Sequence, residues 1–291
     1  MQNRKGMTLV ELIVVIVLIP IVVFLVISVL KMIVYPIRPG YKLACGMNLK
    51  GMANALNVYA FDYRDEYPIQ GAGTHTWGTT TTGWDNPVKD WEESTGTLTV
   101  ASSLFMLVRE ADVGVKSFNC SYGDQQPFVN DTDYDVVELW DFGPNPTEHQ
   151  SYSYQFPYGK FPAGDKSPAG NAVMADRNPW FDGNLTKSSI QNEIAETFAD
   201  KVSLIDILTG ADKWKYQIGN SQPHDREGQN VLFADGHVMF ERRPDVGFED
   251  DNIYTIGGET QEEKRRGIAP TSDVIDAVDE YDSLLVNDRS Q

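Results

Sequence analysis

Side chains that could bind a metal are concentrated in the second half of the 291-residue sequence. His224, Asp235 and His237 lie around an Asp-Gly pair, and Asp176 ends a short apolar run upstream. Imidazole nitrogens and carboxylate oxygens are ligand types of zinc and other transition metals. The four residues are therefore a candidate metal site. The alternative is structural, because Asp-Gly is a strong turn signal and a histidine beside a hairpin often bonds only to backbone.

A second candidate metal site uses harder ligands. The acidic run from Glu249 to Asn252 offers the carboxylate and amide oxygens that calcium prefers. Such a run can equally be a solvated loop. Calcium and zinc are therefore both open as cofactors.

Cys45 and Cys120 are the two cysteines of the chain and form the only possible intramolecular pair. Outside the cytoplasm they can be oxidised, and the chain-entropy model gives a bridge over so long a loop about 4 kcal/mol of stabilisation. The alternative is two separate buried thiols, since free cysteine packs as a small hydrophobe. Two cysteines so far apart in the sequence do not make a zinc site.

Composition and motifs exclude several functional classes. The net charge of −18, from 24 basic and 42 acidic residues, argues against nucleic acid as a partner, because phosphate backbones require clustered Lys and Arg. The sequence contains no nucleophile elbow, no phosphate-binding P-loop and no His-Glu-x-x-His motif. We therefore do not expect an enzyme.

The elements that must position these residues indicate an α+β protein. Residues 41–66 carry apolar side chains at alternating spacings of four and three, which predicts an amphipathic helix. Its apolar stripe consists of Cys45, Leu49, Met52, Leu56, Tyr59 and Tyr63. Runs at 151–156, 172–175, 230–234 and 237–240 predict strands, the last two joined by a hairpin at Asp235-Gly236. We expect a long stem helix packed on a small antiparallel β-sheet with long loops.

The remaining segments give weaker signals. Residues 103–110 predict a short helix, 116–120 an extended piece, and 188–208 a region that can contain helix. Residues 271–286 show a helical apolar stripe after a Ser/Thr cap, which predicts a C-terminal helix or a frayed tail. Three tryptophans recur every seven residues in a long loop, at Trp77, Trp84 and Trp91. They could stack on sugars, but more often such residues pack a loop onto its own domain.

The first thirty residues place one carboxylate inside an otherwise apolar stretch. The run 9–29 is long enough to span a bilayer, yet it includes Glu11. A carboxylate at bilayer depth costs roughly 2.5 to 3.5 kcal/mol on insertion scales. A cleaved secretory signal would have a shorter apolar core and a small-residue cleavage site. A plain anchor, held by Arg4 and Lys5, leaves Glu11 unexplained.

The stretch Lys5-Gly6-Met7-Thr8-Leu9-Val10-Glu11-Leu12 resembles the class III signal of type IV pilins and type II secretion pseudopilins. The resemblance implies that a prepilin peptidase cleaves after Gly6 and methylates the new amino terminus at Met7. Glu11 then becomes the fifth residue and pairs with the amino terminus of a neighbouring subunit in a filament, where a cation makes a buried carboxylate tolerable. The sequence departs from the family in having Met at the first mature position, where Phe is commoner.

A second resemblance lies near the other end of the chain. The stretch from His224 to Val238 is similar to the C-terminal signature of a large bacterial family of pseudopilin-like proteins, in which a histidine precedes an Asp-Gly pair. Ten residues separate His224 from Asp235, one more than in that signature. The patterns Cys45-x-x-Asn48-Leu49 and Phe118-x-Cys120 also resemble that family.

Together the resemblances imply a pilin-like structural subunit of a (pseudo)pilus in a type II secretion-like system. The implied partners are the prepilin peptidase, other pilin-like subunits, the inner-membrane assembly platform and the membrane itself. The chain would cross the inner membrane once, with its head in the periplasm or outside the cell. The rival hypothesis is a membrane-anchored extracytoplasmic binding module that does not polymerise.

The sequence therefore predicts five segments. They are a leader (1–6), a transmembrane stem helix (7–35), an exposed amphipathic stem helix (41–66), an α+β pilin-like head (67–257), and a polar linker with an acidic C-terminal helix or tail (258–291).

Overall fold

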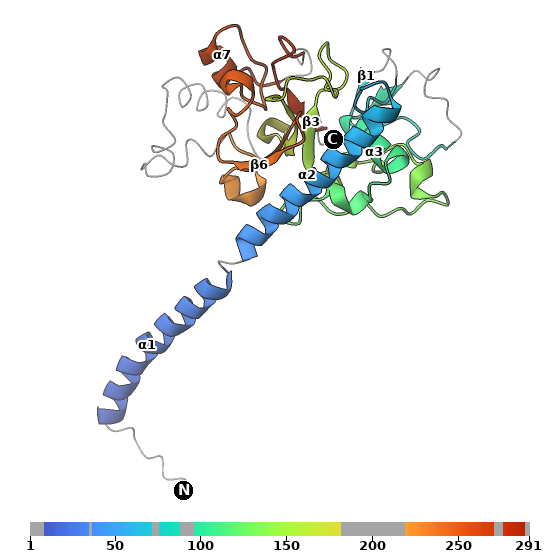
Figure 1. The fold of residues 1–291 in the computed structure, drawn as a ribbon. Coiled ribbons are helices and arrows are strands. Elements are labelled where there is room, and N and C mark those ends of the chain that lie inside the picture. The colour runs from blue at the N-terminus through green and yellow to red at the C-terminus, as the bar shows by residue number, and fades with distance from the viewer. Residues whose placement is uncertain are drawn as a thin grey trace. The chain divides into compact units, whose positions relative to one another are not determined.

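The computed structural model describes residues 9–34, 37–71, 76–87, 96–181, 219–270 and 276–288. The chain divides into two compact units, Met1–Tyr41 and Lys42–Gln291. The first unit contains helix α1 (Leu9–Val34) and the beginning of helix α2 (Ile37–Asp62), while the second contains the rest of α2 and every strand among the described residues (Figure 1). The α+β class predicted from the sequence is confirmed.

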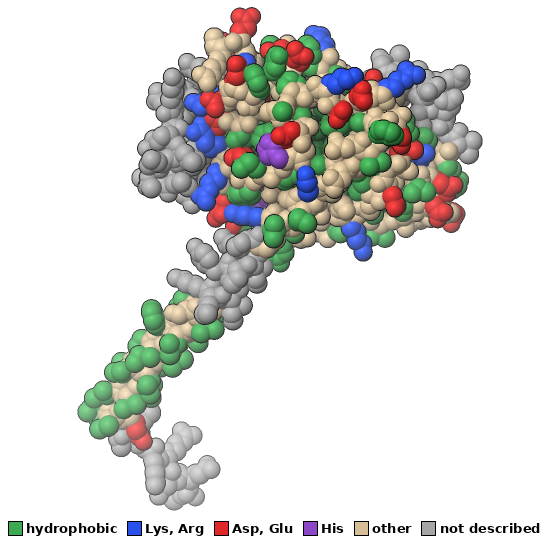
Figure 2. Space-filling model, in the orientation of Figure 1, with side chains coloured by type: hydrophobic (Ala, Val, Ile, Leu, Met, Phe, Trp, Pro, Cys, Tyr) green, Lys and Arg blue, Asp and Glu red, His purple; other side chains and the backbone are tan. Residues whose placement is uncertain are grey.

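Helix α1 consists almost entirely of apolar side chains and continues through Pro20. Its segment Leu9–Leu30 has a mean hydropathy of 3.5, and none of that segment is buried within the chain. Hydrophobic side chains cover the visible surface of this helix (Figure 2). Within the described ranges, this is the one helix whose length and composition suit a membrane span. These properties fit a membrane anchor or a signal sequence.

Helix α2 buries the predicted apolar stripe as far as Tyr59. The buried members are Cys45, Leu49, Met52, Leu56 and Tyr59. The helix ends at Asp62, four residues before the predicted boundary, because Arg64 and Asp65 adopt left-handed backbone angles. Tyr63 therefore lies beyond the helix, partly exposed, and stacks on Tyr59.

The second unit is organised around a five-stranded antiparallel sheet with the order β6-β5-β4-β3-β7. In that order the strands are Val238–Glu241, Gln229–Phe233, Ala172–Asp176, Tyr152–Gln155 and Leu285–Val286. Every residue of β3, β4 and β5 is buried, so both faces of the central sheet are covered. The four strands predicted from the sequence are confirmed, as is the turn between β5 and β6, where Gly236 has φ +81°.

A third helix, α3 (Val100–Glu110), packs into the same core as α2. It confirms the helix predicted at 103–110. A short parallel pair, β1 (Thr76–Trp77) and β2 (Thr97–Leu98), precedes it. The 3₁₀ turns are Val115–Phe118, Val136–Glu138, Pro146–Glu148, Pro179–Phe181, Pro223–Arg226 and Phe248–Asp250. The first corrects the extended piece predicted at 116–120, while the region 188–208 lies outside the described residues.

The C-terminal segment differs most from expectation. The predicted linker contains a short helix, α7 (Gln261–Arg266), held by a capping box between Thr260 and Glu263. The predicted helix at 271–286 is wrong for the described residues from 276 onward, which contain turns and strand β7. β7 pairs with β3 at the edge of the sheet, and its two residues are fully buried. Pairing a free sheet edge therefore prevailed over the local helical pattern.

The tryptophans pack against their own domain where the structure describes them. The indole of Trp77 contacts the rings of Phe156 and Phe181, and that of Trp84 contacts Phe128 edge-on. Trp91 lies outside the described residues. These contacts favour the packing interpretation over sugar binding for the first two.

Candidate functional site

The first candidate site is the start of helix α1. Glu11 lies in the first turn and is exposed in the single chain, where a carboxylate also interacts favourably with the helix dipole. Gly6 and Met7, the residues of the predicted cleavage, lie outside the described residues. Of the three residues predicted to act at this end of the chain, the structure therefore describes only Glu11.

The second candidate site lies between α2 and the sheet, where Cys45 and Cys120 are joined by a disulfide. Cys45 comes from α2, and Cys120 follows the 3₁₀ turn Val115–Phe118. Their Cα atoms are 5.5 Å apart although 75 positions separate them in the sequence, and this distance is typical of disulfides. Of the two alternatives left open by the sequence, the structure has the bridge.

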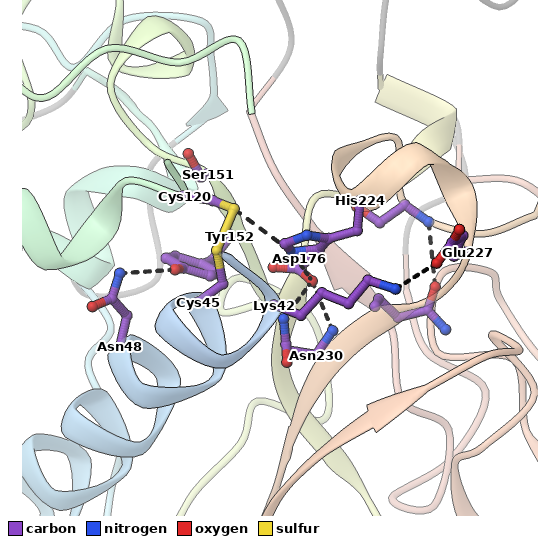
Figure 3. Close-up of polar contacts among 12 residues, drawn as sticks. Lys42, Cys45, Asn48, Cys120, Ser151, Tyr152, Asp176, His224, Glu227 and Asn230 are labelled. Atoms are coloured by element: carbon purple, nitrogen blue, oxygen red, sulfur yellow. Dashed lines mark hydrogen bonds and ion pairs between the residues drawn. A yellow bond between two sulfur atoms is a disulfide. The ribbon is translucent and has the colours of Figure 1, made fainter. Parts of the chain in front are cut away.

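Two further polar side chains lie against this disulfide (Figure 3). Nε2 of His224 is 3.7 Å from Sγ of Cys120 and 3.5 Å from Oδ2 of Asp176. One potential ligand atom from each of Cys45, Cys120, Asp176 and His224 lies within 4.8 Å of the other three. All four residues are buried. We call these four residues the cysteine–histidine cluster.

His224 is held by an unusual backbone and by two aromatic rings. It begins three consecutive residues with left-handed φ angles, of 64°, 57° and 56°, a conformation that costs free energy for non-glycine residues. The ring of Tyr122 stacks on the imidazole at 5.5 Å, and Phe240 contacts it edge-on. Burial, and next the positive charge of Lys42, lower the pKa of His224 to about 4. The imidazole is therefore neutral at pH 7, and its contact with Asp176 is not an ion pair.

Asp176, the last residue of β4, is oriented by the neighbouring strand. Its Oδ2 accepts hydrogen bonds from the backbone N–H of Asn230, at 2.7 Å, and from the side-chain amide of Asn230, at 3.1 Å. Its Oδ1 has no hydrogen-bond partner among the described residues. Burial raises the pKa of Asp176 to about 7, and the two bonds from Asn230 oppose that rise.

The predicted metal residues do not come together as one set. His224 precedes β5 and Asp235 follows it, so the length of the strand, about 17 Å at 3.3 Å per residue, separates them. Asp235 and His237 are partly exposed and bond to each other in the hairpin turn. Asp235 also accepts a hydrogen bond from the backbone N–H of His237, which lowers its pKa. The structure therefore separates His224 and Asp176 from Asp235 and His237 in the predicted metal set. Asp235 and His237 instead stabilise the hairpin turn.

The acidic run predicted to bind calcium is engaged with basic side chains of α7. Lys264 donates to Glu249 at 2.8 Å, and Arg265 donates to Asp250 at 2.9 Å. Asp251 is buried, and its Oδ2 accepts a hydrogen bond from the backbone N–H of Ser283. Through these two contacts the acidic run joins the turn Phe248–Asp250 to helix α7.

Sequence reasoning grouped His224 with Asp176 and paired Cys45 with Cys120, but it did not bring these two pairs together. It also missed Asn230, which orients Asp176, and Tyr122, which covers His224. The four members of the cluster come from four separate segments, so no local spacing connects them. The one available signal was that Asp176 and Asn230 are polar residues at the ends of the apolar runs that form β4 and β5.

A surface pocket of about 440 Å³ adjoins the cluster on the side of Tyr122. Tyr122, Gln125, Arg177, Asp225 and Arg226 are among its lining residues. The hydroxyl of Tyr122 donates to Asp225 at 2.8 Å, so the ring that stacks on His224 also forms part of the pocket wall. The buried cluster is thus one aromatic ring away from a solvent-accessible hollow.

Comparison of the chain with protein-family models, with curated proteins and with solved structures found no match. The architecture itself is a long apolar N-terminal helix, followed by a second helix that packs on a five-stranded antiparallel sheet. This arrangement is consistent with a pilin-like protein.

Proposed function

We propose that the protein is a pilin-like structural subunit that assembles into a (pseudo)pilus of a type II secretion-like system. In this proposal a prepilin peptidase cleaves after Gly6, and α1 holds the chain in the inner membrane with the second unit in the periplasm or outside the cell. Other pilin-like subunits and the inner-membrane assembly platform are its partners. Its role is architectural rather than catalytic.

The observation that carries the proposal is the composition of α1. The segment of α1 that is long enough to span a membrane, Leu9–Leu30, is exposed throughout. Its apolar surface is therefore available for lipid or for neighbouring helices. Glu11 is the single acidic residue on that helix, and it stands in the first turn. The charge is costly in lipid unless a cation approaches it, and a methylated amino terminus at Met7 of an adjacent subunit supplies one.

The test replaces the charge and leaves the shape nearly unchanged. Glu11→Gln should insert in the membrane and be cleaved as before, because a neutral amide is easier to place in lipid. Assembly should fail, because removing one partner of a buried ion pair costs about 3 to 5 kcal/mol. Cross-linking of native membranes, followed by separation of sheared filaments from the inner-membrane fraction, measures both results.

Glu11→Asp is the matched control, since it keeps the negative charge and should retain more assembly than Glu11→Gln. A Glu11→Gln chain that assembles as well as the parent contradicts the proposal. Absence of oligomers in the parent itself would favour the rival, a membrane-anchored binding module.

A further inference from the structure

The cysteine–histidine cluster has the donor set of a closed metal site, and two of its separations between ligand atoms match such a site. Bonds of about 2.0 to 2.3 Å to a tetrahedral zinc ion place neighbouring ligand atoms roughly 3.3 to 3.8 Å apart. The two measured separations, 3.7 Å from Cys120 Sγ to His224 Nε2 and 3.5 Å from that nitrogen to Asp176 Oδ2, fall within this range. The ligand atom of Cys45 lies within 4.8 Å of the other three.

A second, independent observation concerns the carboxylate of Asp176. Asp176 is fully buried, and its Oδ1 lacks a hydrogen-bond partner within the described part of the chain. A buried carboxylate oxygen without a partner is unfavourable, and native structures seldom contain one without a specific reason. Oδ1 belongs to the same carboxylate as Oδ2, which is 3.5 Å from Nε2 of His224, so a cation bound beside Oδ2 would also lie near Oδ1.

The surroundings already support the ligands as outer residues do in known metal sites. Asn230 donates two hydrogen bonds to Asp176 and so orients its carboxylate. Tyr122 and Phe240 contact the imidazole of His224, whose Nε2 lies 3.7 Å from Sγ of Cys120. The pocket lined by Tyr122 brings solvent to within one aromatic ring of His224.

We propose that Cys45, Cys120, Asp176 and His224 form a tetrahedral site for a zinc-class divalent cation when the two cysteines are reduced. The disulfide and the metal-bound dithiolate are then alternative ways to join α2 to the sheet at one place. The proposal departs from the expectation that two cysteines so distant in sequence make no zinc site, because the fold adds the histidine and the aspartate.

A dithiol reductant supplies the electrons and protons that convert the disulfide form to the reduced form that binds metal. The dithiol gives two electrons and two protons, the Cys45–Cys120 bond breaks to two thiols, and the reductant becomes a disulfide. Both thiols then lose their protons as the cation binds, because thiolate is the ligand form. The sum is protein disulfide, dithiol and divalent cation on one side, and protein metal dithiolate, reductant disulfide and two protons on the other.

Cobalt(II) is a suitable probe, because tetrahedral cobalt thiolates absorb visibly and zinc displaces cobalt from such sites. The full chain in detergent is reduced with a dithiol, freed of reductant and metal under anaerobic conditions, and titrated with cobalt. We expect one cobalt per reduced chain, with a thiolate-to-metal charge-transfer band that zinc abolishes. The oxidised parent, which needs no substitution, should give no such band.

Variants identify the other two ligands. His224→Gln and Asp176→Asn should each weaken cobalt binding at least about 100-fold, since loss of an outer partner alone costs 10- to 100-fold. His237→Gln, at the exposed hairpin, is the matched control and should bind as the parent does. Because the disulfide can close in every one of these chains, near-ultraviolet circular dichroism of the oxidised forms checks that each is folded.

Three results would overturn the inference. The first is a reduced parent that binds no cobalt, and the second is cobalt bound without the thiolate band. The third is tight binding retained in both His224→Gln and Asp176→Asn, which would reduce the site to two adventitious thiols.

Discussion

Individual carboxylates in this protein are used as buried hydrogen-bond acceptors. Asp288 accepts hydrogen bonds from the backbone N–H groups of Val100 and Ala101 at the start of α3, and from the indole of Trp77. Asp141 is fully buried and accepts bonds from the hydroxyls of Thr81 and Thr99. Asp288 therefore joins the C-terminal segment to the start of α3, where the helix dipole also favours a negative charge.

The buried carboxylates predict how stability depends on pH. Burial, and next the charge of Asp288, raise the pKa of Asp141 to about 7. The unfolded chain releases this proton near its ordinary pKa of about 4, so between pH 7 and pH 4 the folded state binds more protons. The free energy of unfolding consequently increases as the pH falls from 7 to 4. This stabilising contribution of Asp141 is lost as the pH rises through 7.

Asp141→Asn should remove this contribution, roughly 2 to 4 kcal/mol over the interval. Urea unfolding of the full chain at a series of pH values measures it. Part of the parent's slope should persist in the variant, because the pKa of Asp176 is raised in the same direction. Asp131→Asn, at an exposed position, is the control. A variant with the parent's full slope would contradict the assignment to Asp141.

At the scale of elements, the C-terminal strand closes the sheet. β7 pairs with β3 through Tyr154 and Val286 and through Gln155 and Leu285. The two residues that follow, Asn287 and Asp288, are also buried. The edge of β3 would otherwise leave backbone N–H and C=O groups without partners in the interior.

Two substitutions distinguish this strand from the helix that the sequence suggests. Val286→Asp places a charge in a fully buried position and should cost about 3 kcal/mol or more. Val278→Asp should change the free energy of unfolding by less than about 0.5 kcal/mol, because Val278 is 46% exposed. In the predicted helix Val278 belongs to the apolar stripe and Val286 does not, so the order of sensitivity would be reversed. Thermal unfolding of the two full-length variants decides between the structures.

At the scale of the whole molecule, the proposed function requires a processed chain. We expect the protein isolated from native membranes to begin at Met7 and to carry one methyl group on its amino terminus. Glu11 would then be the fifth residue of the mature chain. Mass spectrometry of the amino-terminal peptide measures the start and the modification together.

Gly6→Leu provides the comparison, because a bulky side chain at the junction should leave the leader attached while α1 still enters the membrane. Recovery of the intact Met1 leader from the unaltered chain would argue for a plain anchor. The second unit, Lys42–Gln291, should fold equally in both forms, since its core is its own.

The sequence alone determined the elements whose signals are local. The apolar length of α1, the stripe of α2 and the Asp-Gly hairpin between β5 and β6 all follow from periodicity or turn chemistry within a short window. The boundary of α2 could not be read in this way, because the left-handed turn at Arg64 and Asp65 ends the helix while apolar residues continue.

Tertiary structure decided which distant residues meet. Cys45, Cys120, Asp176 and His224 belong to separate segments, and only the packing of α2 on the sheet brings their polar atoms together. The sequence pattern at 271–286 is helical, yet Leu285–Val286 became an edge strand because β3 offered it unpaired backbone groups and a buried surface. Local pattern states what a segment can form by itself, whereas the free energy of pairing and burial against the rest of the chain selects what it does form.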